Sequence, residues 1–352
     1  MRIRQIAVVA PIAVFVAAQA LAQPSIASAR EQAMREYRRA MAEARELYQG
    51  RNRGADQSDT VSRKIRIGRN GQVTIQNVSG TITVTAGSGD EVTIDAVKRA
   101  RGDREQLDRV DVIIEEHPGR VDIRTDYRRG GRFNNTNAWV DYTVVVPDGA
   151  SVDLKSISGE VKVTGVKGSV RVQSISGAVT ATGTPRVELA KTVSGSVELS
   201  GVSSAGDLTA TTVSGSIHVN GVKAHSFDAN TVSGEISLRD AAVERFSARS
   251  ISGAIEYNGE LDKNGQYEGN SHSGSARFTL SGNPGFELNA TTFSGEIRSA
   301  FPLSFGPSST SGGDVVIRPR RGPGDSINAK SGDGSARLSL HTFSGSIVIG
   351  KK

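Results

Sequence analysis

The sequence predicts a mainly β protein, a parallel β-solenoid of about ten coils of 18 to 21 residues with a β-rich N-terminal cap and a short N-terminal helix. Three observations support this fold class. The chain holds 40 glycines but only 5% aromatic residues, a composition that disfavours a compact globular core. Apolar and polar residues alternate with a period of two from Val61 onward. A Ser-Gly pair between apolar residues then returns about every twenty residues, which is typical of stacked repeats.

Residues 1–22 have the features of a signal peptide. Arg2 and Arg4 precede an apolar stretch at 6–18, and Ala20-Leu21-Ala22 has the A-x-A form of a cleavage site. The apolar stretch is shorter than the ~20 residues that span a bilayer. The chain also has no cysteine for a lipid anchor or a disulfide. We therefore expect cleavage after Ala22, export to the periplasm, cell surface or medium, and no stable transmembrane anchor afterwards.

The charge of the chain is mild. Its formal net value of +6 falls to +4 once Arg2 and Arg4 are removed with the signal peptide. The basic residues are spread over both halves of the chain, so no basic stripe indicates a nucleic-acid interface. Nucleic acid is therefore not an expected partner.

Residues 23–60 predict a helical segment followed by a linker. Residues 25–49 contain neither proline nor glycine and are rich in helix formers. A narrow apolar stripe follows 3-4-3-4 spacing along them: Met34, Tyr37, Met41, Ala44 and Tyr48. The stripe fits a coiled-coil or membrane-surface helix, or a helix that lies on the rest of the protein or projects from it. Residues 50–59 form the polar linker.

Residues 61–147 predict a β-rich N-terminal unit. Period-two alternation and a glycine-rich turn at 87–90 indicate half-buried strands. A pair of strands is predicted around the turn His117-Pro118-Gly119, and the strand in "WVDYTVVVPDGA" is ended by Pro147. These strands are longer and less regular than the repeats that follow.

Residues 148–352 predict the β-solenoid repeat domain. The Ser-Gly pairs step by 18, 18, 20, 19, 19, 21 and 21 residues. Their glycines are the predicted corner glycines of the coils: Gly159, Gly177, Gly195, Gly215, Gly234, Gly253, Gly274 and Gly295. Further pairs at 311–312, 331–332 and 344–345 continue the series less evenly. We expect a positive φ at these corners, because glycine adopts it at little cost.

One repeat unit, residues 156–173, is too short to bury its own valines. Stacked units do bury them, because each coil hydrogen-bonds to the coils above and below at roughly 4.8 Å. About ten coils then form a rod roughly 50 Å long. An antiparallel sandwich is the competing architecture, since two strands per unit also suit hairpins. Hairpins, however, do not require the same dipeptide at the same phase through eight units.

Stacking aligns equivalent residues in columns. The residue before each Ser-Gly pair is apolar except at His272: Ile157, Ile175, Val193, Val213, Val232, Ile251, His272 and Phe293. The residue before that one always carries a hydroxyl: Ser156, Ser174, Thr192, Thr212, Thr231, Ser250, Ser271 and Thr292. Strict alternation cannot place both Val172 and Ile175 inside, so we expect a phase shift near Ser174. The pattern leaves open whether the hydroxyl column is buried or exposed.

The stretch "VVVPDGASVDLKSISGEVKVTGVKGSVRV" and the later V/I-S-G-x-I/V units resemble a bacterial family of β-strand repeats called "putative adhesins", a domain of unknown function. The resemblance covers roughly residues 61–352. Its motif is a structural repeat, so the resemblance implies the fold, suggests adhesion as a role, and supplies no catalytic residues. His272 departs from the apolar column, and the N-terminal helix lies outside the resemblance.

Sequence signatures of catalysis are missing. The chain has no nucleophile elbow, metalloprotease motif, P-loop or glycine-rich loop before a helix. None of its five histidines pairs with another at the close spacing of a helical metal motif. We therefore expect no enzyme activity, catalytic residue, cofactor or metal site. A basic cluster in a Pro/Gly-rich stretch is a candidate anion-contact loop: Arg318, Arg320 and Arg321.

These observations predict an exported cell-envelope protein that displays a regular surface to a glycan or protein ligand, as an adhesin or scaffold without catalysis. Self-assembly is one alternative, because "SGSIVIG" would leave a strand edge at the end of the rod, although Lys351 and Lys352 would blunt that edge. A polysaccharide-acting enzyme is the other, with candidate carboxylates after three corners: Glu160, Glu235 and Glu296. Their coils are not adjacent, which disfavours a carboxylate pair.

Overall fold

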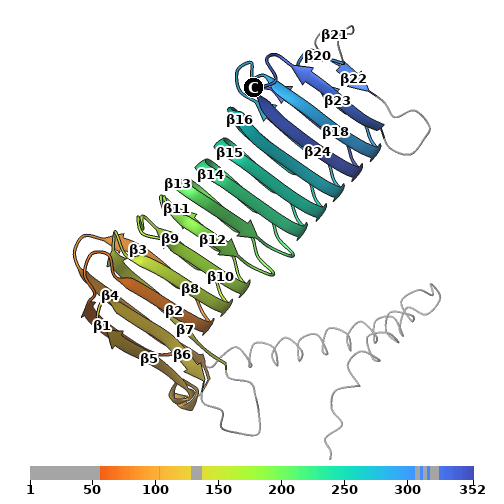
Figure 1. Ribbon diagram of the computed structural model, residues 1–352. Helices are drawn as coiled ribbons and strands as arrows, with labels where there is room; N and C mark the ends of the chain where they lie inside the picture. The colour runs from red at the N-terminus through yellow and green to blue at the C-terminus, as the bar shows by residue number, and fades with distance from the viewer. Residues whose placement is uncertain (1–55, 103, 128–136, 306–309, 312–314, 318–324) are drawn as a thin grey trace, which may run out of the picture. The chain divides into compact units, whose positions relative to one another are not determined.

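The computed structural model describes residues 56–102, 104–127, 137–305, 310–311, 315–317 and 325–352 (Figure 1). The chain divides into a larger unit, Ser58–Ala100 with Arg104–Lys352, and a smaller one, Met1–Gln57 with Arg101–Asp103. Of the smaller unit, only residues 56, 57, 101 and 102 are described. The predicted signal peptide, the predicted helix at 25–49 and the cluster of Arg318, Arg320 and Arg321 all lie outside the described residues.

Seven strands and one short helix make up the N-terminal part of the described chain. They are β1 (Asp56–Arg66), β2 (Gln72–Ser79), β3 (Ile82–Gly87), β4 (Glu91–Arg101), the 3-10 helix η1 (Arg104–Arg109), β5 (Val110–His117), β6 (Arg120–Tyr127) and β7 (Ala138–Pro147). No helix in the described part of the chain is both long and apolar enough to cross a membrane.

The predicted pair of strands around His117 is confirmed, because β5 and β6 are antiparallel and His117 lies opposite Arg120. Strands β4 and β7 are also antiparallel. In contrast, β2 and β3 pair in parallel with β8 and β9 of the repeat region, so residues 72–87 already form part of the stack. Strand β1 begins at Asp56, within the stretch that the sequence assigns to the linker.

Twelve strands follow in the repeat region. They are β8 (Ser151–Ser158), β9 (Val161–Thr164), β10 (Val170–Ser176), β11 (Val179–Thr182), β12 (Val187–Lys191), β13 (Val197–Thr211), β14 (Ile217–Ser233), β15 (Ile236–Ser252), β16 (Ile255–Ser273), β17 (Ala276–Leu280), β18 (Phe286–Ser294) and β19 (Ile297–Ser299).

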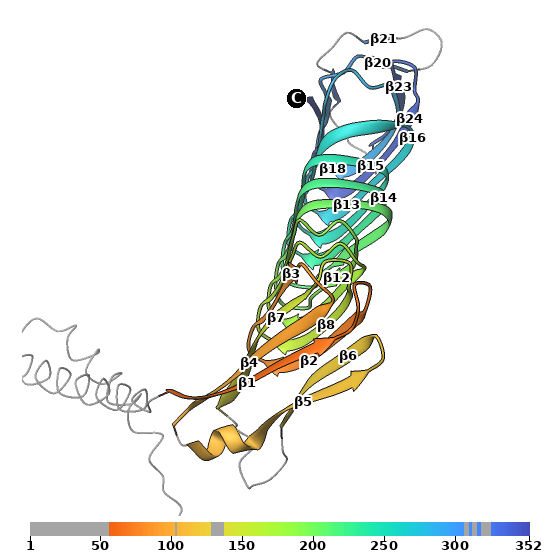
Figure 2. The same cartoon turned by 90° about the vertical axis from the view of Figure 1, so that its left-hand side faces the viewer.

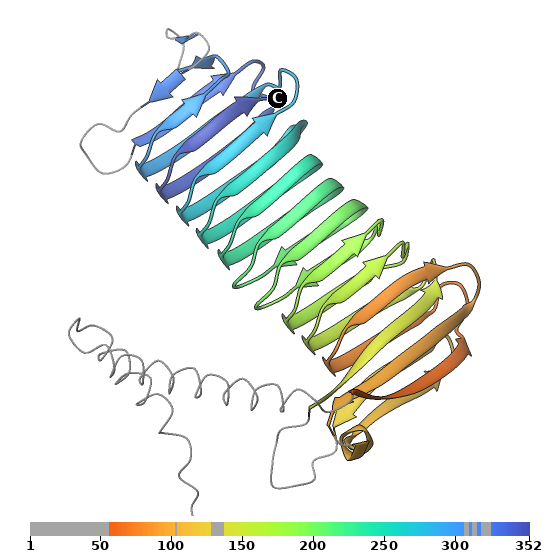
Figure 3. The ribbon, with the colours of Figure 1, turned by 180° about the vertical axis from the view of Figure 1, so that it is seen from behind.

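Strands of neighbouring coils pair in parallel from β8 to β17, which confirms the mainly β class and the parallel pairing expected of the repeat. Figure 2 shows β13 to β16 curving from one face of the stack to the other, and Figure 3 shows the same succession of coils from behind. One ladder contains the strands that lead into each Ser-Gly corner, and a second contains the strands that follow it.

The C-terminal strands do not continue the stack in sequence order. They are β20 (Leu303–Ser304), β21 (Thr310–Ser311), β22 (Val315–Ile317), β23 (Asp325–Ser331), β24 (Ala336–Ser344) and β25 (Ile347–Lys351). Strand β24 pairs in parallel with both β16 and β18, and β25 pairs in parallel with both β17 and β19. The coil of residues 336–351 therefore lies between two coils that are neighbours in sequence (Figure 1).

This insertion corrects two predictions. Strand β25 has a partner on each side, so "SGSIVIG" leaves no open edge, and Lys352 Nζ instead forms an ion pair with Asp240 Oδ1 at 2.9 Å. The pair at 331–332 is not a corner of the stack, and Gly312 lies outside the described residues. Ser311 ends β21, and Ser331 ends β23, which is antiparallel to β18.

The corner glycines lie on top of one another. In spatial order they are Gly80, Gly159, Gly177, Gly195, Gly215, Gly234, Gly253, Gly274, Gly345 and Gly295. From Gly159 onward, a Cβ built on each would lie closer than 3.0 Å to the carbonyl oxygen of the glycine before it, a distance that real Cβ atoms do not show. The expected positive φ holds only for Gly80 and Gly159 among these ten. Close backbone approach, rather than φ, excludes side chains at the other corners.

The structure corrects the expected burial of the apolar column and settles the position of the hydroxyl column, which the sequence left open. Val172 and Ser174 are buried, whereas Ile175 is 52% exposed. Strict alternation therefore continues through Ser174, and the expected phase shift does not occur. The hydroxyl column is buried along the whole stack, and the apolar column faces solvent.

Most of the buried hydroxyls bind the corner backbone. Thr212 Oγ1 donates to Gly195 O at 2.9 Å, and Ser271 Oγ donates to Gly253 O at 2.9 Å. Equivalent bonds join Thr192, Thr231, Ser250 and Thr292 to the glycine of an adjacent coil. Ser156 and Ser174 are the exceptions, because their buried Oγ atoms have no hydrogen-bond partner.

Large aromatic side chains fill the wider coils. Phe246 packs against Phe227, Tyr257 and Phe278 with ring centroids 5.2 to 6.2 Å apart. Tyr257 Oη donates to Glu260 O, and Tyr267 Oη donates to Val243 O, each at 2.6 Å. Burial raises the pKa of Tyr267 to about 12, so its hydroxyl stays a donor.

A methyl group at a corner should force two coils apart. We expect Gly215→Ala to lower the free energy of unfolding by about 2 kcal/mol or more, because its Cβ would meet the backbone of Gly195 rather than a side chain that can move. Denaturant titration followed by circular dichroism measures the change. Gly206→Ala is the matched control, since its Cβ would have no neighbour closer than 3.7 Å. Equal stability of the two variants would contradict the corner argument.

The buried hydroxyls allow a second matched comparison. Ser271→Ala removes a hydrogen bond to Gly253 O, so we expect a loss of about 1 kcal/mol. Ser174→Ala removes a buried hydroxyl that has no partner, so the same change should be neutral or stabilising. Both are read from denaturant midpoints. A larger loss for Ser174→Ala would show that the bonds to the corner carbonyls do not stabilise the stack.

Candidate binding surface

A single exposed column of side chains is the most unusual surface feature of the described chain. We call it the apolar ridge, and in spatial order it contains Val78, Ile157, Ile175, Val193, Val213, Val232, Ile251, His272, Phe343 and Phe293. Eleven large apolar residues are exposed in the described part of the chain, and nine of them belong to this ridge. The other two are Val145 and Val316. Large apolar side chains are therefore gathered in one line rather than scattered.

The register of the ladder keeps the ridge straight. Ile175 lies over Ile157 because Ser174 and Ser176 pair with Ser156 and Ser158. With neighbouring strands roughly 4.8 Å apart, ten positions extend over roughly 43 Å. The exposed fractions of its nine apolar residues run from 36% at Val78 to 53% at Ile251, so each presents between about a third and a half of its surface.

One end of the ridge consists of stacked rings. The His272 and Phe343 rings stack with centroids 4.8 Å apart, and the Phe343 and Phe293 rings stack with centroids 4.7 Å apart. Phe343 reaches this position because β24 is inserted between β16 and β18. His272, the exception in the apolar column, therefore contributes one face of its ring to the same stack.

Polar side chains flank the ridge on both sides. The residues one position after it are all serines next to the corner: Ser79, Ser158, Ser176, Ser194, Ser214, Ser233, Ser252, Ser273, Ser344 and Ser294. The residues two positions before it form the polar row: Gln76, Lys155, Gln173, Lys191, Thr211, Asn230, Arg249, Asn270, His341 and Thr291. The polar row contains three cations and no carboxylate.

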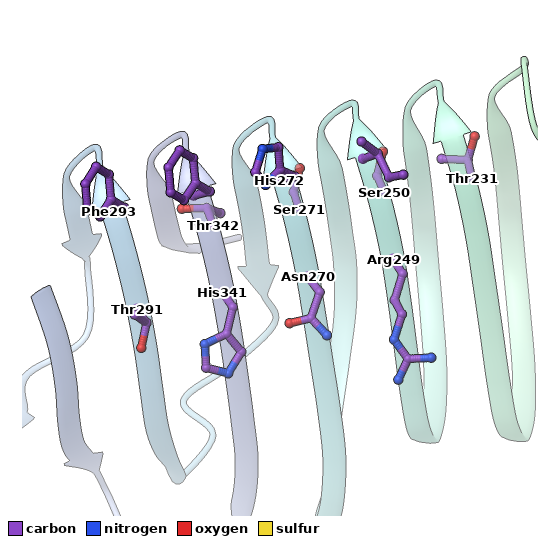
Figure 4. Close-up of a pocket in the computed structure, with 12 residues that line it drawn as sticks. Thr231, Arg249, Ser250, Asn270, Ser271, His272, Thr291, Phe293, His341 and Thr342 are labelled. Atoms are coloured by element: carbon purple, nitrogen blue, oxygen red, sulfur yellow. The ribbon is translucent and has the colours of Figure 1, made fainter. Parts of the chain in front are cut away.

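The ridge and the polar row enclose a shallow hollow at the aromatic end, with a volume of about 680 Å³. Figure 4 shows His272 and Phe293 near the corners, with Arg249, Asn270, His341 and Thr291 in a second line below them. Glu268 lies further along the strand and accepts from Asn270 Nδ2 at 2.5 Å and from Arg249 Nη2 at 3.5 Å. The hollow thus combines an apolar wall with a polar wall that carries a cation.

The three candidate carboxylates are not brought together. Each stands four coils from the next in the order of the corner glycines, which is roughly 19 Å. A paired-carboxylate glycosidase needs about 5 to 9.5 Å. Glu160 Oε2 forms an ion pair with Lys162 Nζ at 2.8 Å, and Glu296 forms one with Arg298.

The apolar column was visible in the sequence, but sequence analysis placed it inside. The signal that assigns it correctly is the alternation itself, which runs from Val170 through Val172 and Ser174 and leaves Ile175 outside. Gly80 and its coil were missed because the chain leaves the stack after β3 and returns only at β8.

Fold and surface together define a class, the stacked-coil β proteins that present a repeated outer face. The chain belongs to the family Toastrack DUF4097, whose model matches residues 72–349. This membership confirms the resemblance to a bacterial repeat family of unknown function. No curated protein matches the chain.

Solved structures with limited similarity to the chain include the following three. A "putative adhesin" from Bacteroides fragilis is 11% identical, with a TM-score of 0.38, and the match covers 84% of this chain and 97% of that one. A "putative lipid binding protein" from Parabacteroides distasonis is 17% identical, with a TM-score of 0.38 and coverage of 64% and 91%. A "putative cell adhesion protein" from Clostridium sporogenes is 10% identical, with a TM-score of 0.23 and coverage of 84% and 100%. With TM-scores below 0.5, these structures support no functional assignment.

The ridge should contribute little to stability. We expect Ile175→Thr to change the free energy of unfolding by less than about 0.5 kcal/mol, because the side chain is half exposed and threonine keeps the branched shape that strands favour. Val172→Thr, three residues earlier, buries a hydroxyl in the core and should cost more than about 1 kcal/mol. Denaturant midpoints compare the two variants. Equal losses would mean that the ridge serves packing rather than contact.

Proposed function

We propose that the protein is an exported, non-catalytic binding protein of the bacterial cell envelope, an adhesin-like scaffold that contacts its ligand along the apolar ridge. The observation that carries this proposal is the confinement of nine of the eleven exposed large apolar residues to one column. Alternation places this column in solvent, where the fold would accept polar side chains equally well. Contiguous exposed apolar surface with a polar rim is typical of interaction sites.

The scaffold suits display. Backbone hydrogen bonds join each inner coil to the coils on either side, and the corner glycines fix the distance between coils. Side chains of the ridge are therefore held in a fixed line, and little conformational freedom is lost when a ligand covers them. The signal peptide predicted at residues 1–22 supports export, and the wide separation of the candidate carboxylates supports a role without catalysis.

The test uses protein purified from a host that exports it. Wild type and the triple variant Ile157→Thr, Ile175→Thr and Ile251→Thr are compared for retention on immobilised envelope fractions: lipid, peptidoglycan, surface glycan and membrane protein. We expect wild type to be retained on at least one fraction and the triple variant to lose at least about tenfold in affinity, because three apolar contacts are removed.

Val145→Thr and Val316→Thr together form the control, since these exposed valines lie off the ridge. The control should bind as wild type does. Retention of the triple variant at wild-type affinity on every fraction that wild type binds would reject the ridge as the contact surface.

A further inference from the structure

We propose that the apolar ridge and the polar row together form a peripheral binding face for a lipid bilayer with anionic headgroups. This inference rests on the proposed function and names the partner of the same surface. Four observations carry it. They are the length of the ridge, the positive charge of the polar row, the orientation of the Phe343 ring, and the lack of opposite charges that could pair if two copies packed ridge to ridge.

The ridge is long, narrow and chemically uniform. Its ten positions extend over roughly 43 Å, and the hollow of about 680 Å³ lies at the aromatic end. A continuous apolar medium contacts every position of such a line at once. Half-exposed Val, Ile and Phe side chains in a line can enter the boundary between headgroups and acyl chains, which interfacial elements reach to a depth of about 5 to 10 Å.

The cationic side chains of the polar row lie beside the ridge. The polar row stands two residues back from the ridge along each strand, a distance of about 6.6 Å. It carries Lys155, Lys191 and Arg249 and no carboxylate. With the ridge at the acyl boundary, the long side chains of these cations can extend to the phosphates of anionic lipids, which attract basic side chains. The serine column on the other flank is uncharged.

Two of these cations have partners within the protein, but the ion pairs are loose. Lys155 Nζ lies 3.7 Å from Asp153 Oδ2, and Arg249 Nη2 lies 3.5 Å from Glu268 Oε1. Both cationic side chains are about half exposed, at 47% and 58%. Exposed pairs of this kind contribute little, so Lys155 and Arg249 can turn to a phosphate without a large cost.

The central ring of the aromatic end, Phe343, offers no free face on which a sugar could stack. Phe343 is stacked on both faces, by His272 on one side and Phe293 on the other, at 4.8 and 4.7 Å. Both faces of the Phe343 ring are therefore covered, and its edge points to solvent. Ring edges fit an acyl environment, whereas a sugar stacks on an exposed ring face.

A second copy of the chain fits less well. If two ridges pack with the rods antiparallel, the polar row of one copy faces the polar row of the other, and cations meet cations. If the rods are parallel, the polar row faces the uncharged serine column. Neither arrangement pairs opposite charges beside the ridge, whereas an anionic bilayer does.

Vesicle co-sedimentation tests the inference. The probes are vesicles of phosphatidylethanolamine with phosphatidylglycerol, and vesicles of phosphatidylcholine alone. We expect wild type to bind the anionic vesicles more tightly and to lose binding as salt is added. The triple Ile→Thr variant should bind the anionic vesicles at least about tenfold more weakly. The variant Lys155→Gln, Lys191→Gln and Arg249→Gln should lose a similar factor on anionic vesicles but not on phosphatidylcholine.

Two controls separate the face from the rest of the chain. Val145→Thr with Val316→Thr changes exposed valines off the ridge, and Arg277→Gln removes an exposed cation outside the polar row. Both should bind as wild type does. The natural absence of cysteine allows a third readout: an environment-sensitive fluorophore on Ile251→Cys should shift to the blue with anionic vesicles, and the same label on Val145→Cys should not.

Several results would overturn the inference. In one such result, wild type binds neither kind of vesicle, but the triple variant loses retention on a glycan or protein fraction. This result would rule out the bilayer as the partner and would leave the proposed function standing. Vesicle binding unchanged in the triple variant would place lipid contact elsewhere in the chain. Reversible dimers of wild type that the triple variant abolishes, without vesicle binding, would assign the ridge to a second copy.

Discussion

Every coil of this protein depends on one contact, the approach of a corner glycine to the carbonyl group of the glycine in the coil beneath. No side chain fits between them, so the backbones can stack at the spacing of a β-ladder. Buried hydroxyls such as Thr212 and Ser271 bind the same carbonyl groups from the interior. The repeated Ser-Gly motif thus reflects a requirement of the backbone, and the residues beside it are free to vary with function.

The residues beside the Ser-Gly pair differ in how strongly the fold constrains them. The two residues that precede each Ser-Gly pair alternate between the interior and solvent. The interior one is Asn77 in the Gly80 coil and a hydroxyl residue in the others, and most of these side chains bind the corner backbone. The outer one has no structural duty, yet it is Val, Ile or Phe in nine of ten coils. A position that the fold leaves open but that stays apolar through the stack is the strongest indication of where the protein makes contact. The polar row beside it lacks carboxylates along the same length, which extends the indication from one column to a face.

The features that could be predicted from the sequence are those set by residues close together in the chain. The features that depend on contacts between distant segments could not be predicted. The repeat, the parallel pairing and the turn at His117 follow from local pattern and are confirmed. The orientation of Ile175 and its equivalents is also set by local alternation. The prediction was wrong because it assumed that these apolar residues are buried, as apolar residues usually are. The coil at Gly80 and the insertion of β24 were beyond prediction because they depend on pairing between distant segments. "TTFSGEI" and "HTFSGSI" are nearly the same sequence, so nothing local decides which of them lies beside β16.

The inserted coil has a consequence for how the chain must be made. Strands β16 and β18 belong to consecutive coils of the sequence but are held apart by a coil that the ribosome delivers about fifty residues after β18. Until residues 336–351 emerge, β16 presents an unoccupied ladder edge, and the segment from β18 to β19 can occupy that edge itself. A nascent chain can therefore close the stack one coil early, and the late arrival of Phe343 between His272 and Phe293 then requires that closed pair to open. The last part of the ridge to form is its aromatic end, so a complete contact surface requires residues 336–351.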